Sequence, residues 1–103
     1  RETITKIISS GDYSGVEGIT VYPNPVINSL HISFFTSTAI LQEFRIINLE
    51  GKPVMRKENT SRQGYNLFYI DISNLIRGMY ILEINSITPN IYPAKKVFKL
   101  IKV

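Results

Sequence analysis

The sequence predicts an all-β fold, a seven-stranded antiparallel immunoglobulin-like β-sandwich. From residue 19 onward apolar and polar residues alternate with a period of two, and turn-forming residues recur roughly every eight to twelve positions, a pattern typical of sandwiches and barrels. Isoleucine and the aromatic residues Tyr and Phe, which favour strands, are abundant. No stretch with apolar residues at helical spacing reaches about ten residues, so no helix is expected.

The first two expected strands flank a proline-rich corner. Residues 19–22 form the first strand, and Pro23-Asn24-Pro25 ends it because each proline fixes φ and lacks a backbone N–H. In the second strand apolar residues alternate with polar ones, which predicts one buried and one exposed face. The inward residues are Leu30, Ile32 and Phe34, and the outward ones are Ser29, His31 and Ser33.

The middle of the chain is expected to form a hairpin followed by a loop. Residues 42–48 make the third strand and residues 53–57 the fourth. The turn between them contains Gly51, which can take the positive φ that a short hairpin needs, and Lys52. Residues 59–64 are polar, and we expect them to form a loop that leads through Gly64 into the next strand.

Two further strands follow. Residues 66–72 alternate between apolar and polar as a fifth strand, which begins at Asn66. A tight connection at residues 73–78 contains Leu75, whose side chain we expect to reach the core. Residues 79–87 form the sixth strand, with one apolar face made by Tyr80, Leu82 and Ile84.

The last expected strand is basic. After a Thr-Pro-Asn break it starts at Tyr92 or Ala94 and runs to Lys102. The net charge of +4 lies entirely in residues 84–103, because basic and acidic residues balance before them and no acidic residue follows Glu83. The charge comes from Lys95, Lys96, Lys99 and Lys102. These lysines either form a surface that a partner recognises or keep an edge strand soluble, and the sequence leaves both interpretations open.

Residues 1–18 differ from the rest of the chain. Glycine and serine are concentrated between Ser9 and Gly18, and such a segment does not hold regular structure for long. We therefore expect residues 1–18 to be a flexible linker or the tail of an upstream domain, and residues 19–103 to be the folded domain. The first residue is Arg1, so we expect the chain to be a piece of a longer polypeptide.

The composition argues against several classes of function. Cysteine is absent, which excludes disulfides, thiolate metal sites and cysteine nucleophiles. No apolar run is long enough to span a membrane as a helix, and no nucleic-acid-binding motif accompanies the basic strand. His31 is the only histidine, and Asp71 and Glu83 lack any accompanying catalytic group. We therefore expect no metal, no cofactor and no catalysis.

Several short motifs occur in a fixed order along residues 19–103. Val21-Tyr22-Pro23-Asn24-Pro25 comes first, followed by an apolar strand, the Gly51-Lys52 turn and Gly64-Tyr65-Asn66. Asp71-Ile72-Ser73-Asn74-Leu75 then leads to Gly78-Met79-Tyr80 and a terminal strand with lysines. In this order the motifs resemble a C-terminal sorting domain of the type IX (Por) secretion system, of type A. One departure is the longer approach Ile91-Tyr92-Pro93 ahead of Phe98, which leaves the register of the last strand open.

The resemblance implies a delivery signal for an upstream cargo protein in a Gram-negative bacterium. Such proteins reach the periplasm, an outer-membrane translocon recognises the domain, and a surface sortase then removes it, leaving the cargo at the cell surface or outside the cell. The cut is expected in the segment Ser9 to Gly18. The residues expected to contact the translocon are Gly78, Tyr80, Lys95, Lys96, Lys99 and Lys102.

Other roles for the motif residues remain open. Gly78 and Tyr80 can serve the fold instead of recognition, as a turn glycine and an inward tyrosine. The residues expected to be structural are Pro23, Asn24, Pro25, Gly51, Lys52, Gly64, Asn66 and Leu75. The alternative function is a non-catalytic carbohydrate- or protein-binding module, with Tyr65, Tyr69 and Tyr92 as candidate aromatic contacts. An exposed edge strand also permits pairing with a partner or a dimer.

Overall fold

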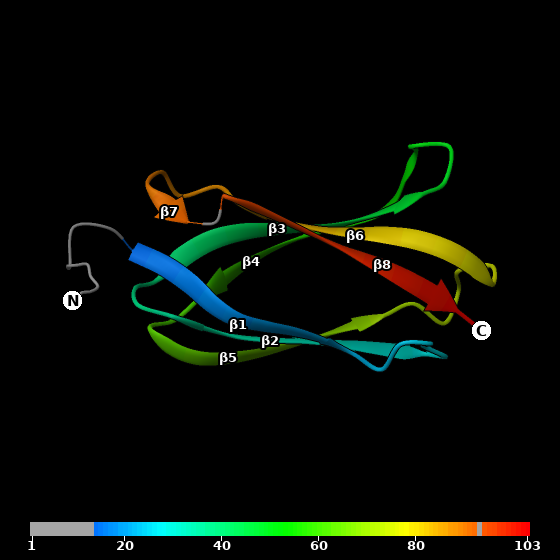
Figure 1. The fold of residues 1–103 in the computed structure, drawn as a ribbon, viewed down its shortest axis with the longest axis horizontal. Coiled ribbons are helices and arrows are strands. Elements are labelled where there is room, and N and C mark those ends of the chain that lie inside the picture. The colour runs from blue at the N-terminus through cyan, green and yellow to red at the C-terminus, as the bar shows by residue number, and fades with distance from the viewer. Residues whose placement is uncertain (1–13, 93) are drawn as a thin grey trace, which may run out of the picture.

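A computed structural model describes residues 14–92 and 94–103, which form two four-stranded sheets packed face to face (Figure 1). The predicted all-β sandwich is therefore confirmed. The described residues contain eight strands rather than seven, because the last expected strand is divided in two. The strands are β1 Ser14–Tyr22, β2 Ser29–Thr36, β3 Ile40–Asn48, β4 Pro53–Ser61, β5 Gly64–Asp71, β6 Gly78–Ser86, β7 Ile91–Tyr92 and β8 Lys95–Lys102.

The strand order is that of an immunoglobulin-like sandwich. One sheet has the order β5-β2-β1-β7 and the other β4-β3-β6-β8. The first, second and fifth strands thus share one sheet, as strands A, B and E do in immunoglobulin domains, and β3, β6 and β8 correspond to C, F and G. All strand pairs are antiparallel except the short parallel pair of β1 with β7, in which Ser14 lies beside Ile91.

The last part of the chain moves from one sheet to the other. β7 pairs with the start of β1, and β8 then pairs with the whole length of β6 (Figure 1). The register of β8 places Phe98 opposite Leu82 and Leu100 opposite Tyr80. Ile91 and Tyr92 therefore form a separate pairing with β1 and do not shift the apolar positions of β8.

Strand β1 begins earlier than the sequence predicts. It starts at Ser14, so residues 14–18 of the expected linker belong to the sheet. The reason is a β-bulge: the register with β2 shifts between Glu17 and Thr20, where Gly18 takes a φ of +61°. A bulge lets a glycine-containing segment stay paired. Residues 1–13, the remainder of the expected linker, lie outside the described residues.

Strand β4 is longer than predicted, and the expected loop at residues 59–64 is wrong. The polar residues from Asn59 to Ser61 pair with the first residues of β3. β4 lies at the edge of its sheet, where polar side chains are compatible with a strand because one face and one edge meet solvent. The turn itself is short, and the Asn66 side chain closes it by accepting from Arg62 N at 3.0 Å and donating to Arg62 O at 2.8 Å.

The core lies between the two sheets. The predicted inward residues of β2 and β6 are all buried. The buried apolar residues are Val16, Val26, Leu30, Ile32, Phe34, Ile40, Phe44, Ile46, Ile70, Ile72, Tyr80, Leu82, Ile84, Ile91 and Leu100. Leu75 packs against this cluster from the β5–β6 connection, as predicted.

The core also holds one buried polar side chain that has no hydrogen bond in the described structure. Gln42 of β3 is 0% exposed, and neither its Oε1 nor its Nε2 atom has a partner. A buried amide without partners costs stability, because it has lost its hydrogen bonds to water.

We therefore expect Gln42→Met to raise the free energy of unfolding by about 1–3 kcal/mol, because methionine has a similar length and no amide to desolvate. Urea unfolding measures the change. Gln63→Met in the exposed β4–β5 turn is the matched control and should change the stability little. A lower stability of Gln42→Met would contradict this account of the core.

Candidate recognition surface

The four lysines of the terminal strand do not form a single stripe. Residues alternate across β8, so Lys95 and Lys99 lie on the outer face of the sheet. Lys96 and Lys102 lie on the same side as the core residue Leu100. Lys102 is only 8% exposed, and its Nζ donates to Val103 O at 3.1 Å. The expected lysine surface is therefore divided between two faces of one edge strand.

Ion pairs hold part of the charge on the outer face. Glu83 of β6 lies between two cations, with Arg45 Nη1 at 3.4 Å from Oε1 and Lys95 Nζ at 3.4 Å from Oε2. The last acidic residue of the chain thus pairs with the first lysine of the basic strand. Lys96 and Lys99 are exposed and have no ion pair among the described residues. Among the four lysines of β8, these two side chains are the most available to a partner.

A second ion-pair group lies at the far edge of the same sheet. Arg56 of β4 donates from Nε to Glu43 and from Nη2 to Glu58, the latter at 2.8 Å. The hydrogen bond and charge of Glu43 raise the pKa of the Arg56 guanidinium. Such exposed pairs contribute little to stability, about 0–1 kcal/mol each. The β4 edge is therefore neutralised, whereas the β8 edge is basic.

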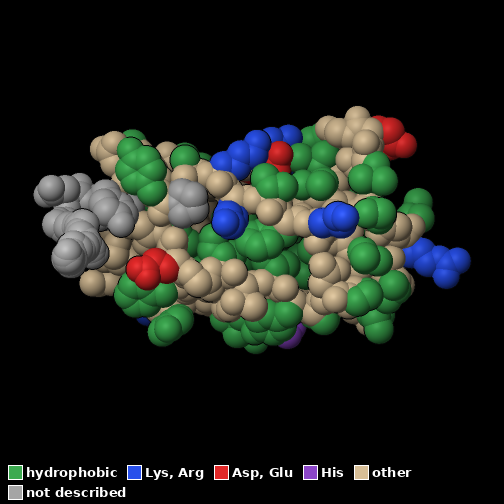
Figure 2. All heavy atoms as spheres, in the orientation of Figure 1, with side chains coloured by type: hydrophobic (Ala, Val, Ile, Leu, Met, Phe, Trp, Pro, Cys, Tyr) green, Lys and Arg blue, Asp and Glu red, His purple; other side chains and the backbone are tan. Residues whose placement is uncertain are grey.

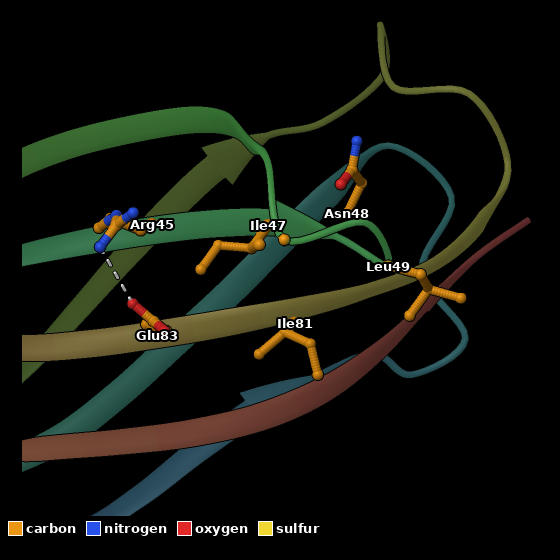
Figure 3. A pocket seen from close by; sticks show the side chains of 7 residues that line it. Arg45, Ile47, Asn48, Leu49, Ile81 and Glu83 are labelled. Carbon is orange, nitrogen blue, oxygen red and sulfur yellow. Dashed lines mark hydrogen bonds and ion pairs between the residues drawn. The ribbon is translucent and has the colours of Figure 1, made fainter.

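A hollow lies on the outer face of this sheet, beside the β3–β4 turn (Figure 3). Apolar side chains of Ile47, Leu49 and Ile81 line it, and the Arg45–Glu83 pair borders it. Figure 3 shows that the ion pair and the apolar side chains occupy adjacent parts of β3 and β6. The hollow offers an apolar contact beside the basic strand and brings together no catalytic grouping.

The proline-rich corner covers half of the edge of β8. Asn24 Nδ2 donates to Lys99 O at 2.9 Å, and Asn24 Oδ1 accepts from Ile101 N at 3.0 Å. Val26 continues the pairing: its N donates to Ile101 O at 2.8 Å, and its O accepts from Val103 N at 2.9 Å. The segment 23–26, which we call the edge clamp, thus does more than end the first strand. This contact was not predicted from the sequence.

Gly78 and Tyr80 lie at the start of β6. Gly78 has a φ of +152° and is exposed, so the backbone conformation accounts for the glycine. Tyr80 is 9% exposed, and its hydroxyl donates to Ile76 O in the preceding turn. In the folded domain Tyr80 therefore holds the turn to the core and offers a partner little surface.

The other motif residues form turns. Gly51 has a φ of +85°, and Asn48 Oδ1 accepts from Lys52 N at 2.9 Å, so the β3–β4 turn depends on an asparagine that the sequence did not single out. Gly64, with a φ of +106°, opens β5. Asp71 ends β5 and accepts hydrogen bonds from Ser73, which hold the pKa of its carboxyl below its usual range. Asp71 is therefore a turn residue.

The candidate chemical groups remain apart. Asp71 lies on β5 and Glu83 on β6, which belong to different sheets. The His31 ring packs edge-to-face between the rings of Tyr22 and Tyr69, at centroid distances of 5.0 and 4.6 Å. In residues 14–92 and 94–103 no three His, Asp or Glu side chains gather in a way that could hold a metal ion.

The candidate aromatic contacts are divided in the same way. Tyr65 and Tyr69 are exposed on the outer face of β5, whereas Tyr92 lies on β7, with two strands between them. The three tyrosines therefore do not form one row. The described part of the chain also contains no helix long and apolar enough to cross a membrane.

The chain is similar to a known family of protein domains. A family model described as "Secretion system C-terminal sorting domain" matches residues 20–99, which run from the end of β1 into β8. A search of the curated proteins finds no match.

Proposed function

The chain belongs to the family of C-terminal sorting domains of the type IX (Por) secretion system, and from this premise we propose that it carries an upstream cargo protein through the outer-membrane translocon of that system. Sorting domains of this family are not catalytic, and membership implies interaction with the type IX machinery and export to the cell surface or the extracellular space. The observation that carries the proposal is the family match over residues 20–99.

The proposed contact region is the exposed part of β8. Lys95, Lys96 and Lys99 are exposed, and they lie within the basic strand at the edge of the sandwich. The arrangement supports recognition of a folded surface, because the strand order and the clamp fix the position of each lysine. Gly78, Tyr80 and Lys102 are proposed to shape this region, since Tyr80 and Lys102 are largely buried.

Removal of the domain by a sortase completes the proposed sequence of events in a Gram-negative cell, from the periplasm to the surface. Of the expected cleavage segment, residues 9–18, we propose that the part before Ser14 is cut. Residues 14–18 belong to β1, and a protease needs an accessible, extended backbone.

The test replaces the three exposed lysines by glutamine in a reporter protein fused ahead of the 103-residue chain. In a bacterium with a type IX system we expect Lys95→Gln/Lys96→Gln/Lys99→Gln to lower the surface-delivered fraction about tenfold, because each lost surface ion pair with a partner is worth up to roughly 0.5–1 kcal/mol. Surface labelling of the reporter and cell fractionation measure the result.

The matched control is Lys52→Gln/Lys57→Gln, which removes exposed lysines from the β3–β4 turn and from β4. Its delivery should equal that of the unchanged chain. Thermal unfolding of both variants must show that each remains folded. Unchanged delivery of the triple variant would leave the lysines as edge protection only.

A further inference from the structure

The edge of β8 is closed over one half and open over the other. Ile101 N and O bind the edge clamp, so the backbone groups of every second residue from Lys95 to Val103 point away from β6. The clamp occupies the groups from Lys99 O onward. Val97 N, Val97 O and Lys99 N have no hydrogen-bond partner in the described part of the chain. An open edge of this kind can accept another strand.

The open half borders a gap between the two sheets. On the side of β1 opposite β2, pairing is described only at Ser14 and Gly15, so the rest of β1 also has a free edge there. Ile19, Val21 and Phe98 pack against the core but remain partly exposed. Figure 2 shows hydrophobic side chains in this opening, with Lys or Arg side chains beside it. A strand added to β8 would cover apolar surface as well as form main-chain hydrogen bonds.

The charges along the open half define what such a strand must carry. Its outward side chains would lie beside Lys95 and Lys99, and its inward side chains would lie over Phe98 and Val21. We propose that residues 95–99 bind an extended segment of a partner protein in which apolar residues alternate with Asp or Glu. This inference rests on the proposed function, whose contact region it specifies.

A second copy of this chain fits the same edge poorly. Antiparallel pairing of two β8 strands about Val97 would place Lys95 of each copy opposite Lys99 of the other. Like charges directly opposite each other destabilise a strand pair. The edge clamp also prevents a shift of register toward Val103. The chain is therefore expected to stay monomeric through this edge and to pair with an acidic strand.

The test uses the 103-residue chain and two synthetic nine-residue peptides, one alternating Val with Glu and one alternating Val with Lys. Methylation of alternate peptide nitrogens leaves each peptide one pairing edge. We expect the Glu peptide to bind at least about tenfold more tightly than the Lys peptide. The reason is that the two peptides place opposite charges beside the two outward lysines of β8, and each such pair changes the binding free energy by a fraction of a kcal/mol up to about 1 kcal/mol. Amide exchange measured by NMR should slow at Val97 and Lys99.

Two variants locate the binding. Val97→Pro removes the amide that faces the added strand and leaves the β6–β8 hydrogen bonds intact, because these use the intervening residues. Lys95→Glu/Lys99→Glu keeps the backbone and should reverse the preference between the peptides, whereas Lys52→Glu/Lys57→Glu should not. Protection of β4 amides instead of Val97, or equal binding of both peptides, overturns the proposal. If the chain forms a concentration-dependent dimer and Val97→Pro abolishes that dimer, the proposal is overturned, because a second copy of the chain then occupies the edge.

These outcomes are separate from those of the export test. Absence of peptide binding together with reduced export of the triple glutamine variant would leave the sorting function standing and reject the acidic strand. Peptide binding with unchanged export would retain the acidic-strand site and reject its role in sorting.

Discussion

Deleting residues 94–103 from a precursor that carries this chain is expected to abolish surface delivery of the cargo, which should then remain in the periplasm. The deletion removes the whole of β8 and with it every lysine of the proposed contact region. It also removes Leu100 from the core and exposes the far edge of β6. The loss should exceed that of the glutamine variant, because contact and fold are lost together. Cell fractionation and protease accessibility of the cargo measure it.

The two causes can be separated on the isolated chain. Circular dichroism should show that the deletion variant has lost its cooperative unfolding transition, whereas the triple glutamine variant keeps it. A smaller deletion of Val103 alone removes one hydrogen bond to Val26 and serves as the control. Surface delivery at the normal level by the variant that lacks residues 94–103 would disprove the sorting role of the terminal strand.

Phe44→Ala is expected to lower the free energy of unfolding by about 3–5 kcal/mol. Phe44 is 1% exposed at the centre of β3, and its ring packs edge-to-face on Phe68 of the opposite sheet at a centroid distance of 5.5 Å. A domain of this size has a total stability of about 5–15 kcal/mol, so the loss is a large share. Urea unfolding measures it, with Thr60→Ala on exposed β4 as the control. A loss below about 1 kcal/mol would mean that the core repacks.

The same variant tests whether the secretion machinery recognises the folded domain or an extended terminal segment. Phe44→Ala leaves every residue of β8 unchanged but lowers the population of the folded domain. Recognition of a folded surface then predicts reduced delivery at a temperature where the variant is partly unfolded, and recovery at lower temperature where it is folded. Normal delivery of the unfolded variant would instead indicate that the terminal segment is read as an extended sequence.

Much of the fold follows from local patterns. The inward residues of β2 and β6 are buried as predicted, because alternation along a strand decides which face a side chain occupies whatever its partner strand. Gly51 takes the positive φ that its turn requires. The start of β1 and the end of β4 were predicted wrongly, because glycine and polar residues at these positions resemble a linker or a loop. A bulge at Gly18 keeps residues 14–18 in β1, and the edge position of β4 accommodates polar residues up to Ser61.

The candidate surface depended on contacts between distant parts of the chain. Asn24 and Lys99 are separated by 75 positions, and nothing in the Pro-Asn-Pro motif indicates which backbone its side chain binds. The pairing of Lys95 with Glu83 requires the register of β8 on β6. The division of the four lysines between two faces matters for recognition because β8 is an edge strand, and the position of β8 at the edge follows from the strand order.

The sequence by itself determined the all-β class, the inward faces of the strands, the family resemblance and the basic character of the last strand, since each of these depends on residue type and short spacing. The tertiary structure decided which lysines are available, which edge is open and how far the clamp closes it. Those properties arise from hydrogen bonds and ion pairs between residues far apart in the chain, which exist only after the two sheets have packed.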